Sequence, residues 1–224
     1  MPALSMITHV YNSQASVDHH LALWKDYSQA LRDSIEFIVI DDFSTPELVI
    51  DRGPLNLRHF RVDDDIDWNM PGCRNLAAIT ASSPWMLYFD ADNVIPPEQL
   101  SHLVAALGTL DERTLYVFRR IHDGEEVDPH INSFLISRKG FFRAGGYDED
   151  FAGHYGFEDV LFRNMWRTHT GREVLLTDIQ FQQMSWRTSD LDRDTSRNEQ
   201  LIANKAAANF PKPQAFLRFN WHEV

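Results

Sequence analysis

The sequence predicts an α/β fold with a Rossmann-like, mostly parallel central sheet flanked by helices. Runs with strand and helix periodicity alternate through the first half of the 224 residues. Two strand-length runs, residues 35–40 and 85–89, are almost continuously apolar, as in strands that are covered on both faces. Both runs end in acidic residues, so we expect carboxylates at the carboxyl edge of the sheet, where open α/β sheets bind ligands.

The opening of the chain is predicted to be a strand–helix–strand unit. Residues 4–10 form an apolar run that ends in the polar turn Tyr11-Asn12-Ser13. Apolar residues then recur at three- and four-residue intervals through residue 31, which predicts one helix. The buried strand at 35–40 follows this helix.

The next elements follow the same alternation. A short strand is predicted at residues 57–62, and Pro71-Gly72 begins a helix of small residues that runs to residue 79. After the strand at 85–89, Pro96-Pro97 begins a helix that ends near Gly108.

The second half of the chain is less regular. Its expected elements are strands at 115–118, 132–137, 173–177 and 179–184, a helix that begins at Glu158 and a helix over 192–208. The charged stretch 121–130 is predicted to be a loop. Residues 210–224 form a tail rich in aromatic residues, which must dock on the chain or contact a partner.

Composition narrows the classes of partner. The formal net charge of -12 argues against nucleic acid or anionic lipid as the main partner, because both require a basic surface. The single cysteine, Cys73, excludes an intramolecular disulfide and fits a reducing compartment. No segment approaches the ~20 apolar residues of a membrane span, so we expect a cytoplasmic protein without an integral membrane segment.

Asp90 and Asp92 are the first candidate site residues. They follow a buried strand directly, where the backbone turns, so both carboxylates can converge on one cation. Mg²⁺ and Mn²⁺ prefer such oxygen ligands and often share them with substrate phosphates. The alternative interpretation is a turn with a side-chain cap, which Pro96-Pro97 downstream would suit.

Two further features have both a structural and a functional interpretation. Arg74 lies in the first turn of a predicted helix, where it is either an ion-paired side chain or part of an anion site. Glu158 and Asp159 begin another helix, where acidic residues commonly complement the helix dipole.

Together with these features, six landmarks occur in order over roughly residues 5–184. The landmarks are Val10-Tyr11-Asn12, Asp41-Asp42-Phe43-Ser44-Thr45, Cys73-Arg74-Asn75, Asp90-Ala91-Asp92, Gly145-Gly146-Tyr147-Asp148-Glu149 and Glu158-Asp159. Through them the sequence resembles family 2 glycosyltransferases of the GT-A fold. The resemblance is to the soluble, non-processive type, because the segment Ser185-Trp186-Arg187 lacks the spacing of the processive Gln-x-x-Arg-Trp motif.

The resemblance implies a nucleotide pocket at the amino-terminal landmarks. His9, Tyr11 and Asn12 would belong to this pocket, with Tyr11 stacking on the base. Asp42 would accept a hydrogen bond from an N–H edge such as that of uracil. Arg74 would lie near the base or the diphosphate.

The resemblance also implies the catalytic groups. Asp90 would contact the ribose or a metal ion, and Asp92 would bind the Mn²⁺ or Mg²⁺ that bridges the diphosphate. Asp159 would act as the base, and Glu158 would orient the acceptor hydroxyl.

One departure from the family concerns the metal site. Family members often carry a metal-binding His on a late strand, where this chain has Gln180-Phe181-Gln182-Gln183. Either Gln183 supplies a carbonyl oxygen, or Asp92, phosphates and water hold the ion alone. His154 and His169 are the nearest histidines in the sequence.

We therefore expect one GT-A domain over residues 1–224. Its parts are a nucleotide-sugar-binding half to about 95, an acceptor half to about 190, and a C-terminal helix with the aromatic tail over 191–224. The implied activity is inverting transfer of a sugar from a nucleotide-diphosphate donor, commonly UDP, to a hydroxyl of a saccharide acceptor, as in polysaccharide biosynthesis. The tail would close the acceptor groove or form a homodimer contact.

Two other functions stay open. A nucleotide-sugar-binding protein that has lost catalysis fits the missing late His. A nucleotidyltransferase is disfavoured, because residues 12–16 after the first strand are neither glycine-rich nor basic.

Overall fold

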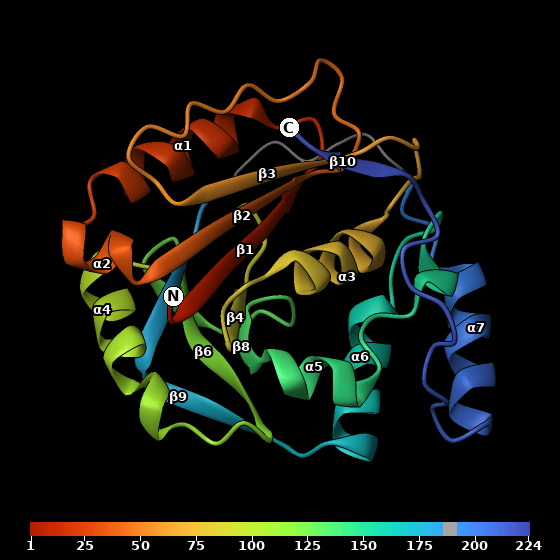
Figure 1. Ribbon diagram of the computed structural model, residues 1–224. Helices are drawn as coiled ribbons and strands as arrows, with labels where there is room; N and C mark the ends of the chain where they lie inside the picture. Colours follow the sequence, from red (N-terminus) through yellow and green to blue (C-terminus); the bar gives the residue numbers. More distant parts are fainter. Residues whose placement is uncertain (186–191) are drawn as a thin grey trace.

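The computed structural model describes residues 1–185 and 192–224 and contains a central sheet between two layers of helices (Figure 1). The expected boundary near residue 190, and Trp186 and Arg187, lie outside the described residues. The strands are β1 (Leu4–Val10), β2 (Ile35–Asp41), β3 (Leu57–Val62), β4 (Trp85–Tyr88), β5 (Asn93–Val94), β6 (Thr114–His122), β7 (Glu125–Val127), β8 (Phe134–Ser137), β9 (Arg172–Gln183) and β10 (Trp221–Glu223). The α-helices are α1 (Gln14–Lys25), α2 (Gln29–Asp33), α3 (Met70–Thr80), α4 (Pro97–Ala106), α5 (Arg138–Ala144), α6 (Glu158–His169) and α7 (Ser196–Ala207).

The strands form one mixed sheet in the order β10-β3-β2-β1-β4-β8-β6-β9-β5, with β7 beside β6. β3, β2, β1 and β4 are parallel neighbours, and β10 and β8 join the two sides of this block antiparallel. The predicted α/β fold with a parallel, Rossmann-like block is confirmed. In the described part of the second half, the parallel pairing is that of β6 with β9.

Helices cover both faces of the sheet. One apolar cluster joins the sheet to α1, α2 and α4, and the other joins it to α3, α5 and α6. Strand β2 shows why the sequence requires both layers: Phe37 and Val39 belong to the first cluster, whereas Ile38 and Ile40 belong to the second, and each is at most 1% exposed. Because alternate residues face opposite sides, a continuously apolar strand must be covered twice.

The single helix expected through residue 31 is two helices. α1 ends at Lys25 and α2 begins at Gln29. The hydroxyl oxygen of Ser28 accepts a hydrogen bond from the amide of Leu31 at 3.3 Å, so Ser28 caps a new helix. Among the described residues no helix combines the length and apolarity that crossing a membrane demands.

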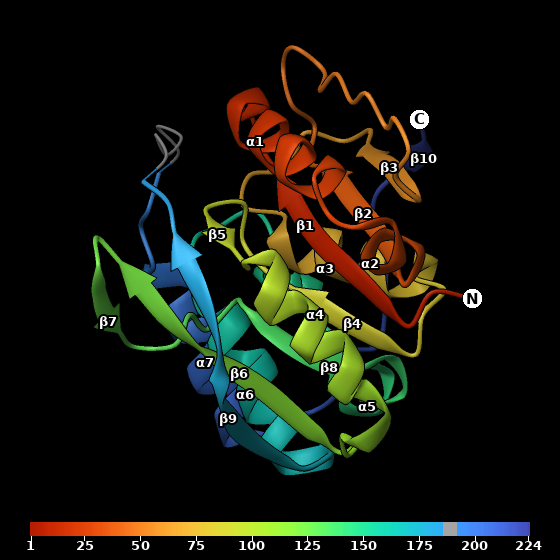
Figure 2. The ribbon, with the colours of Figure 1, turned by 90° about the vertical axis from the view of Figure 1, so that its left-hand side faces the viewer.

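The stretch 121–130, expected to be a loop, contains a β-hairpin. β6 continues to His122 and pairs antiparallel with β7, which lies at the left margin of Figure 2. Asp123 and Gly124 connect these strands with φ angles of 50° and 83°. An Asp-Gly pair tolerates two positive φ angles, which is the requirement of a tight hairpin turn.

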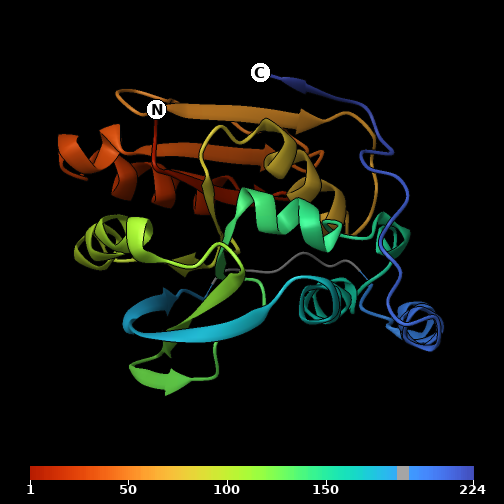
Figure 3. The same ribbon diagram turned by 60° about the horizontal axis from the view of Figure 1, so that its bottom comes forward.

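The aromatic tail docks on its own chain. After α7 it runs along the molecule to β10 (Figure 3), which pairs antiparallel with β3. The buried carboxylate of Glu149 accepts hydrogen bonds from the amides of Leu217 and Arg218 at 2.8 and 2.9 Å, and from Asn75 Nδ2 at 2.8 Å. The last acidic residue of the Gly145–Glu149 landmark therefore holds the tail in place.

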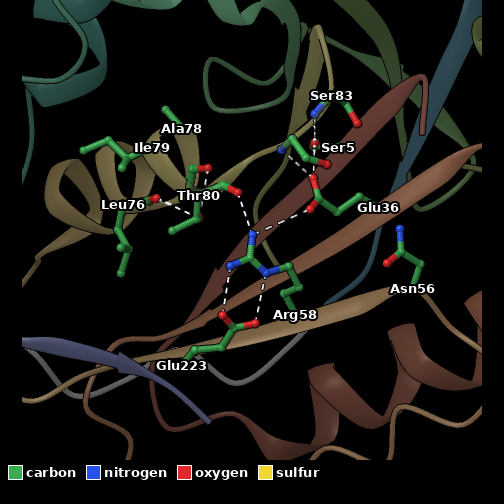
Figure 4. A network of polar contacts seen from close by, with 12 residues as sticks. Ser5, Glu36, Asn56, Arg58, Leu76, Ala78, Ile79, Thr80, Ser83 and Glu223 are labelled. Atoms are coloured by element: carbon green, nitrogen blue, oxygen red, sulfur yellow. Dashed lines mark hydrogen bonds and ion pairs between the residues drawn. The ribbon is translucent and has the colours of Figure 1, made fainter. Parts of the chain in front are cut away.

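A polar network fixes the end of the tail to the sheet (Figure 4). Arg58 of β3 donates two hydrogen bonds to Glu223 of β10 at 2.9 and 2.8 Å, and one to the carbonyl of Thr80 at 2.7 Å. On its other side lies Glu36, which is 3% exposed and accepts hydrogen bonds from Ser5 Oγ and the amide of Ser82. The network thus joins β10, β3, β2 and β1.

The docking of the tail on Glu149 can be tested by substitution. Glu149→Ala should lower the free energy of unfolding by about 2–4 kcal/mol, because it leaves three donors without their charged acceptor in a buried site. Glu125→Ala, at an exposed position of β7, is the matched control and should change it by less than about 0.5 kcal/mol. Urea denaturation measures both, and equal stabilities for the two variants would contradict this role of Glu149.

Candidate functional site

A cavity of about 380 Å³ lies at the carboxyl edge of the parallel block. β1, β2 and β4 run in the same direction, so their carboxyl ends meet at this edge. The cavity is lined from β1 by His9, from the end of β4 by Asp90, from the loop before β8 by His130, and from α6 by Glu158 and Asp159. Carboxylates that are far apart in sequence therefore share one cavity.

Asp90 is held by a buried arginine. Arg74 is 1% exposed, and its Nη2 lies 2.7 Å from Asp90 Oδ1 and 3.0 Å from the carbonyl oxygen of Asn132. The guanidinium also packs against the rings of Tyr88 and Tyr147, with Tyr147 OH 3.2 Å from Nη1. Arg74 therefore lies behind Asp90, outside the cavity lining.

The surroundings of Asp90 keep it ionised. Burial alone would raise its pKa, but the positive charge of Arg74, with smaller contributions from His130, His9 and a hydrogen bond from Asn132, outweighs burial and lowers the pKa of Asp90. His130 Nδ1 lies 3.7 Å from Asp90 Oδ2. Burial, with the charge of Arg74, lowers the pKa of His9 to about 4, so His9 is neutral at pH 7.

Two side-chain amides donate hydrogen bonds to the carboxylate of Asp92. Its Oδ1 accepts a hydrogen bond from Asn93 Nδ2 at 2.6 Å, and its Oδ2 accepts one from Gln183 Nε2 at 3.0 Å. The Gln183 carbonyl oxygen accepts a hydrogen bond from Arg120 at 3.1 Å. Arg120 thereby fixes the orientation of the Gln183 amide, which presents its N–H group to Asp92 and its oxygen elsewhere. Burial and the nearby charge of Asp90 raise the pKa of Asp92.

These contacts define which residues fit a metal ion. Within residues 1–185 and 192–224, no three Asp, Glu, His or Cys side chains come together as a metal site. Asp92 keeps a free lone pair on each oxygen, since each accepts one hydrogen bond in the structure. His169 is engaged with the carbonyl of Phe210, and His154 is exposed outside the cavity lining. The donor set fits a divalent ion whose other ligands come from a substrate, not one held by the chain alone.

Asp41 and Asp42, at the end of β2, have different surroundings. Asp41 is structural: it accepts hydrogen bonds from the amide of Ser44 at 2.7 Å and from Arg61 at 2.5 Å. Asp42 is 5% exposed, and burial raises its pKa to about 7, although hydrogen bonds from Cys73 and Asn69 act in the opposite direction. Asp42 is therefore a buried carboxyl without a full charge partner, which marks it as a functional candidate.

Tyr11 and Asn12 lie beside Asp42, at the end of β1. Tyr11 is partly buried, and burial together with the charges of Asp65 and Asp67 raises its pKa. Asn12 has a φ of 52°, and its Oδ1 accepts a hydrogen bond from the amide of Thr45 at 2.7 Å. Asn12 thus ties the turn after β1 to the turn after β2, and its side chain faces a separate depression beside α1.

Glu158 and Asp159 occupy the first turn of α6. The helix begins after Phe157, whose φ of 71° is unusual for a bulky residue. Burial and the charge of Asp159 raise the pKa of Glu158 to about 7, and its Oε2 is buried without a hydrogen-bond partner in the described structure. Burial also raises the pKa of Asp159. Asp159 Oδ1 accepts a hydrogen bond from the amide of Val160 at 2.6 Å, and both residues line the cavity.

Several lining residues were missed by sequence reasoning. His130 and Asn132 reach Asp90 and Arg74 from the stretch before β8. Trp68, Tyr155 and Arg193 line the cavity from three separate loops. No local pattern marks these positions, because loops contribute them one residue at a time.

One comparison with known proteins identifies a family. The family model described as "Glycosyl transferase family 2" matches residues 5–166. A search of curated proteins finds no match. Several solved structures are similar, and at under 25% identity they show the shared fold.

Three of these structures illustrate the likeness. S. aureus TarS 1–349 has a TM-score of 0.64 at 18% identity, over 81% of this chain and 60% of that one. TarS 1–349 in complex with UDP-GlcNAc has a TM-score of 0.72 at 15% identity, over 96% and 68%. GalNAc-T7 with UDP, GalNAc and Mn²⁺ has a TM-score of 0.61 at 15% identity, over 83% and 44%. The chain thus spans 60% and 68% of the TarS 1–349 chain in these two structures and 44% of the GalNAc-T7 chain.

The buried Asp42 carboxyl predicts a stability change with pH. Asp42→Asn should raise the free energy of unfolding at pH 8 by about 2–4 kcal/mol, since burial disfavours the ionised carboxylate in the folded protein. Below about pH 4, Asp42 of the wild type is protonated in both the folded and the unfolded state. The difference in the free energy of unfolding between Asp42→Asn and the wild type should therefore be smallest there. It should grow as pH rises to about 7 and stay constant above.

The measurement is urea denaturation across this pH range. Asp128→Asn, at an exposed position, is the control and should show no such pH-dependent difference. An Asp42→Asn protein with the same difference at pH 4 and pH 8 would contradict the raised pKa.

Proposed function

Because the chain belongs to glycosyl transferase family 2, we propose that it transfers a sugar from a nucleotide-diphosphate donor to a hydroxyl of a saccharide acceptor, with inversion at the anomeric carbon. One observation carries this proposal. Asp90, at the end of β4, and the pair Glu158-Asp159, on α6, line the same cavity. The cavity can therefore hold the donor phosphates near Asp90 and the acceptor hydroxyl near Glu158 and Asp159, with the reacting anomeric carbon between them.

The donor we propose is a UDP-sugar. Tyr11 and Asp42 lie together at the ends of β1 and β2, and Asp42 suits the edge of a uracil ring. When ionised, Asp42 accepts a hydrogen bond from the ring N–H; when protonated, it donates one to a ring carbonyl. TarS is solved with UDP-GlcNAc and shares the fold, which supports the same donor class here.

A divalent cation, Mn²⁺ or Mg²⁺, fits this site when a diphosphate is bound. Asp92 would hold the ion through its carboxylate, with the remaining ligands supplied from outside the chain. When bound, the ion supplies positive charge to the leaving diphosphate. GalNAc-T7, which shares the fold, is solved with Mn²⁺. Arg74 orients Asp90, and Gln183 and Asn93 orient Asp92.

Asp159 is the proposed base and Glu158 the residue that orients the acceptor hydroxyl. The hydroxyl oxygen forms a bond to the anomeric carbon, its proton passes to the Asp159 carboxylate, and the bond from that carbon to the diphosphate oxygen breaks. A carboxylate with a raised pKa holds a transferred proton more readily than a free one. Asp159 requires no other activation, because an ionised carboxylate is already a base.

A second candidate is a nucleotide-sugar-binding protein without transferase activity. The observation in its favour is the clamp on Asp92, in which Gln183 presents an N–H group where a further ligand oxygen or nitrogen would strengthen a metal site. This candidate predicts UDP-sugar binding with neither transfer nor hydrolysis.

Asp159→Asn tests the proposed chemistry. The substitution should lower kcat by about 10²–10⁴-fold for transfer, or for slow hydrolysis of a UDP-sugar, because it removes the general base. UDP affinity should stay within about twofold, since Asp159 lies on the acceptor side. Asp128→Asn provides the control at an exposed site. Full activity in Asp159→Asn would exclude this residue as the base, and a wild-type protein that binds donors without turnover would favour the binding protein.

A further inference from the structure

Three side chains at the mouth of the cavity form a cluster that the proposed chemistry does not use. Trp68 lies in the loop before α3, Tyr155 in the loop before α6, and Arg193 just before α7. The centroids of the two aromatic rings are 4.6 Å apart with an interplanar angle of 54°. The Arg193 guanidinium carbon lies 5.7 Å from the Trp68 ring centre and 5.6 Å from that of Tyr155.

Hydrogen bonds between the loops hold this cluster in place. Trp68 Nε1 donates a hydrogen bond to the carbonyl of Asp192 at 2.6 Å, which holds the backbone next to Arg193. The amide of Gly153 donates to the carbonyl of Asp67 at 2.7 Å, which fixes the Tyr155 loop against the Trp68 loop. The positive φ of Trp68, 51°, shows that the chain adopts an unfavourable conformation to place this ring.

Among residues 1–185 and 192–224, Arg193 forms no salt bridge with an acidic side chain, although Asp192 and Asp194 flank it in the sequence. It is exposed, and its contacts there are the two ring faces. The other arginine at this site, Arg74, is buried and paired with Asp90. Within the described part of the chain, Arg193 is therefore the one arginine or lysine in the cavity lining. The protein as a whole is acidic, with a formal net charge of -12.

The cluster lies on the acceptor side of the cavity. Tyr155 is three residues before Glu158 in the same loop-to-helix segment, and both line the cavity with Asp159. An aromatic face beside a guanidinium can hold a sugar ring by its C–H face and a phosphate or carboxylate by charge-assisted hydrogen bonds. A neutral sugar would use the rings and leave the charge without a partner.

We propose that Trp68, Tyr155 and Arg193 form an acceptor subsite for a saccharide that carries an anionic group, a phosphate or a carboxylate, next to its reacting sugar. This inference rests on the proposed glycosyltransferase function and specifies its acceptor class. Arg193 binds the anion, and the two rings position the sugar over the carboxylates of α6.

The first experiment uses the protein saturated with UDP on an array of neutral, phosphate-bearing and uronate-bearing saccharides. Binding should concentrate on the anionic members, and the phosphate and uronate arms identify which anion is used. Calorimetric titration of the strongest binder then compares variants. Arg193→Gln should weaken its binding by about 10–100-fold, whereas Arg143→Gln, which removes the same charge from an exposed site on α5, should not change it.

A second pair of variants separates the ring from the hydroxyl of Tyr155. Tyr155→Leu should weaken saccharide binding by about tenfold, and Tyr155→Phe should preserve it, because the ring face makes the contact. Arg193 is exposed, so its variants should keep the wild-type melting temperature, which excludes misfolding as the cause of lost binding.

Three outcomes would overturn the subsite. In the first, neutral saccharides bind as well as anionic ones, and Arg193→Gln has no effect on binding. In the second, no saccharide binds the UDP-saturated protein. In the third, Arg193→Gln weakens UDP binding and leaves saccharide binding unchanged, which would assign Arg193 to the donor site. Failure of the wild type to bind UDP is a different result, because it rejects the proposed function. In that case Arg193-dependent binding of anionic saccharides without nucleotide would still support the subsite.

Discussion

The ion pair between the buried Arg74 and the partly exposed Asp90 organises the site. Arg74 connects four parts of the fold: α3, on which it lies, the end of β4 through Asp90, the stretch before β8 through Asn132, and the Gly145–Glu149 segment through Tyr147. Removal of the Asp90 carboxylate would leave Arg74 buried without its charge partner, which typically costs about 3–5 kcal/mol. This pair therefore fixes the position of Asp90 in the cavity wall and keeps that carboxylate ionised.

The other carboxyl groups of the site are held at a cost to stability. Burial raises the pKa values of Asp42 and Glu158 to about 7, and it also raises that of Asp159. Groups held in this way are suited to exchange protons and hydrogen bonds with a ligand near neutral pH. Contacts elsewhere in the fold offset this cost to stability. Among them are the hydrogen bonds that Glu149 and Arg58 make with the C-terminal tail.

The parts of the structure that follow from local sequence were predictable, and those that depend on distant pairing were not. The strand at residues 4–10 and the acidic start of α6 are encoded by composition and spacing within a few residues. The contact of Gln183 with Asp92 depends on the pairing of β5 with β9, and β10 depends on the return of the tail to β3, neither of which leaves a periodic signal. The hairpin at Asp123-Gly124 is different, because its turn signal is present in the sequence and was outweighed by the surrounding charges.

The proposed function requires a nucleotide-diphosphate site at the carboxyl edge of β1, β2 and β4. Calorimetric titration of UDP into the wild-type protein and Asp92→Ala, each with and without Mn²⁺ or Mg²⁺, tests for this site. UDP should bind the wild type, and the cation should strengthen binding. Asp92→Ala should lose this strengthening, whereas Asp128→Asn should retain it. A wild-type protein that binds no UDP under any of these conditions would contradict the proposed function.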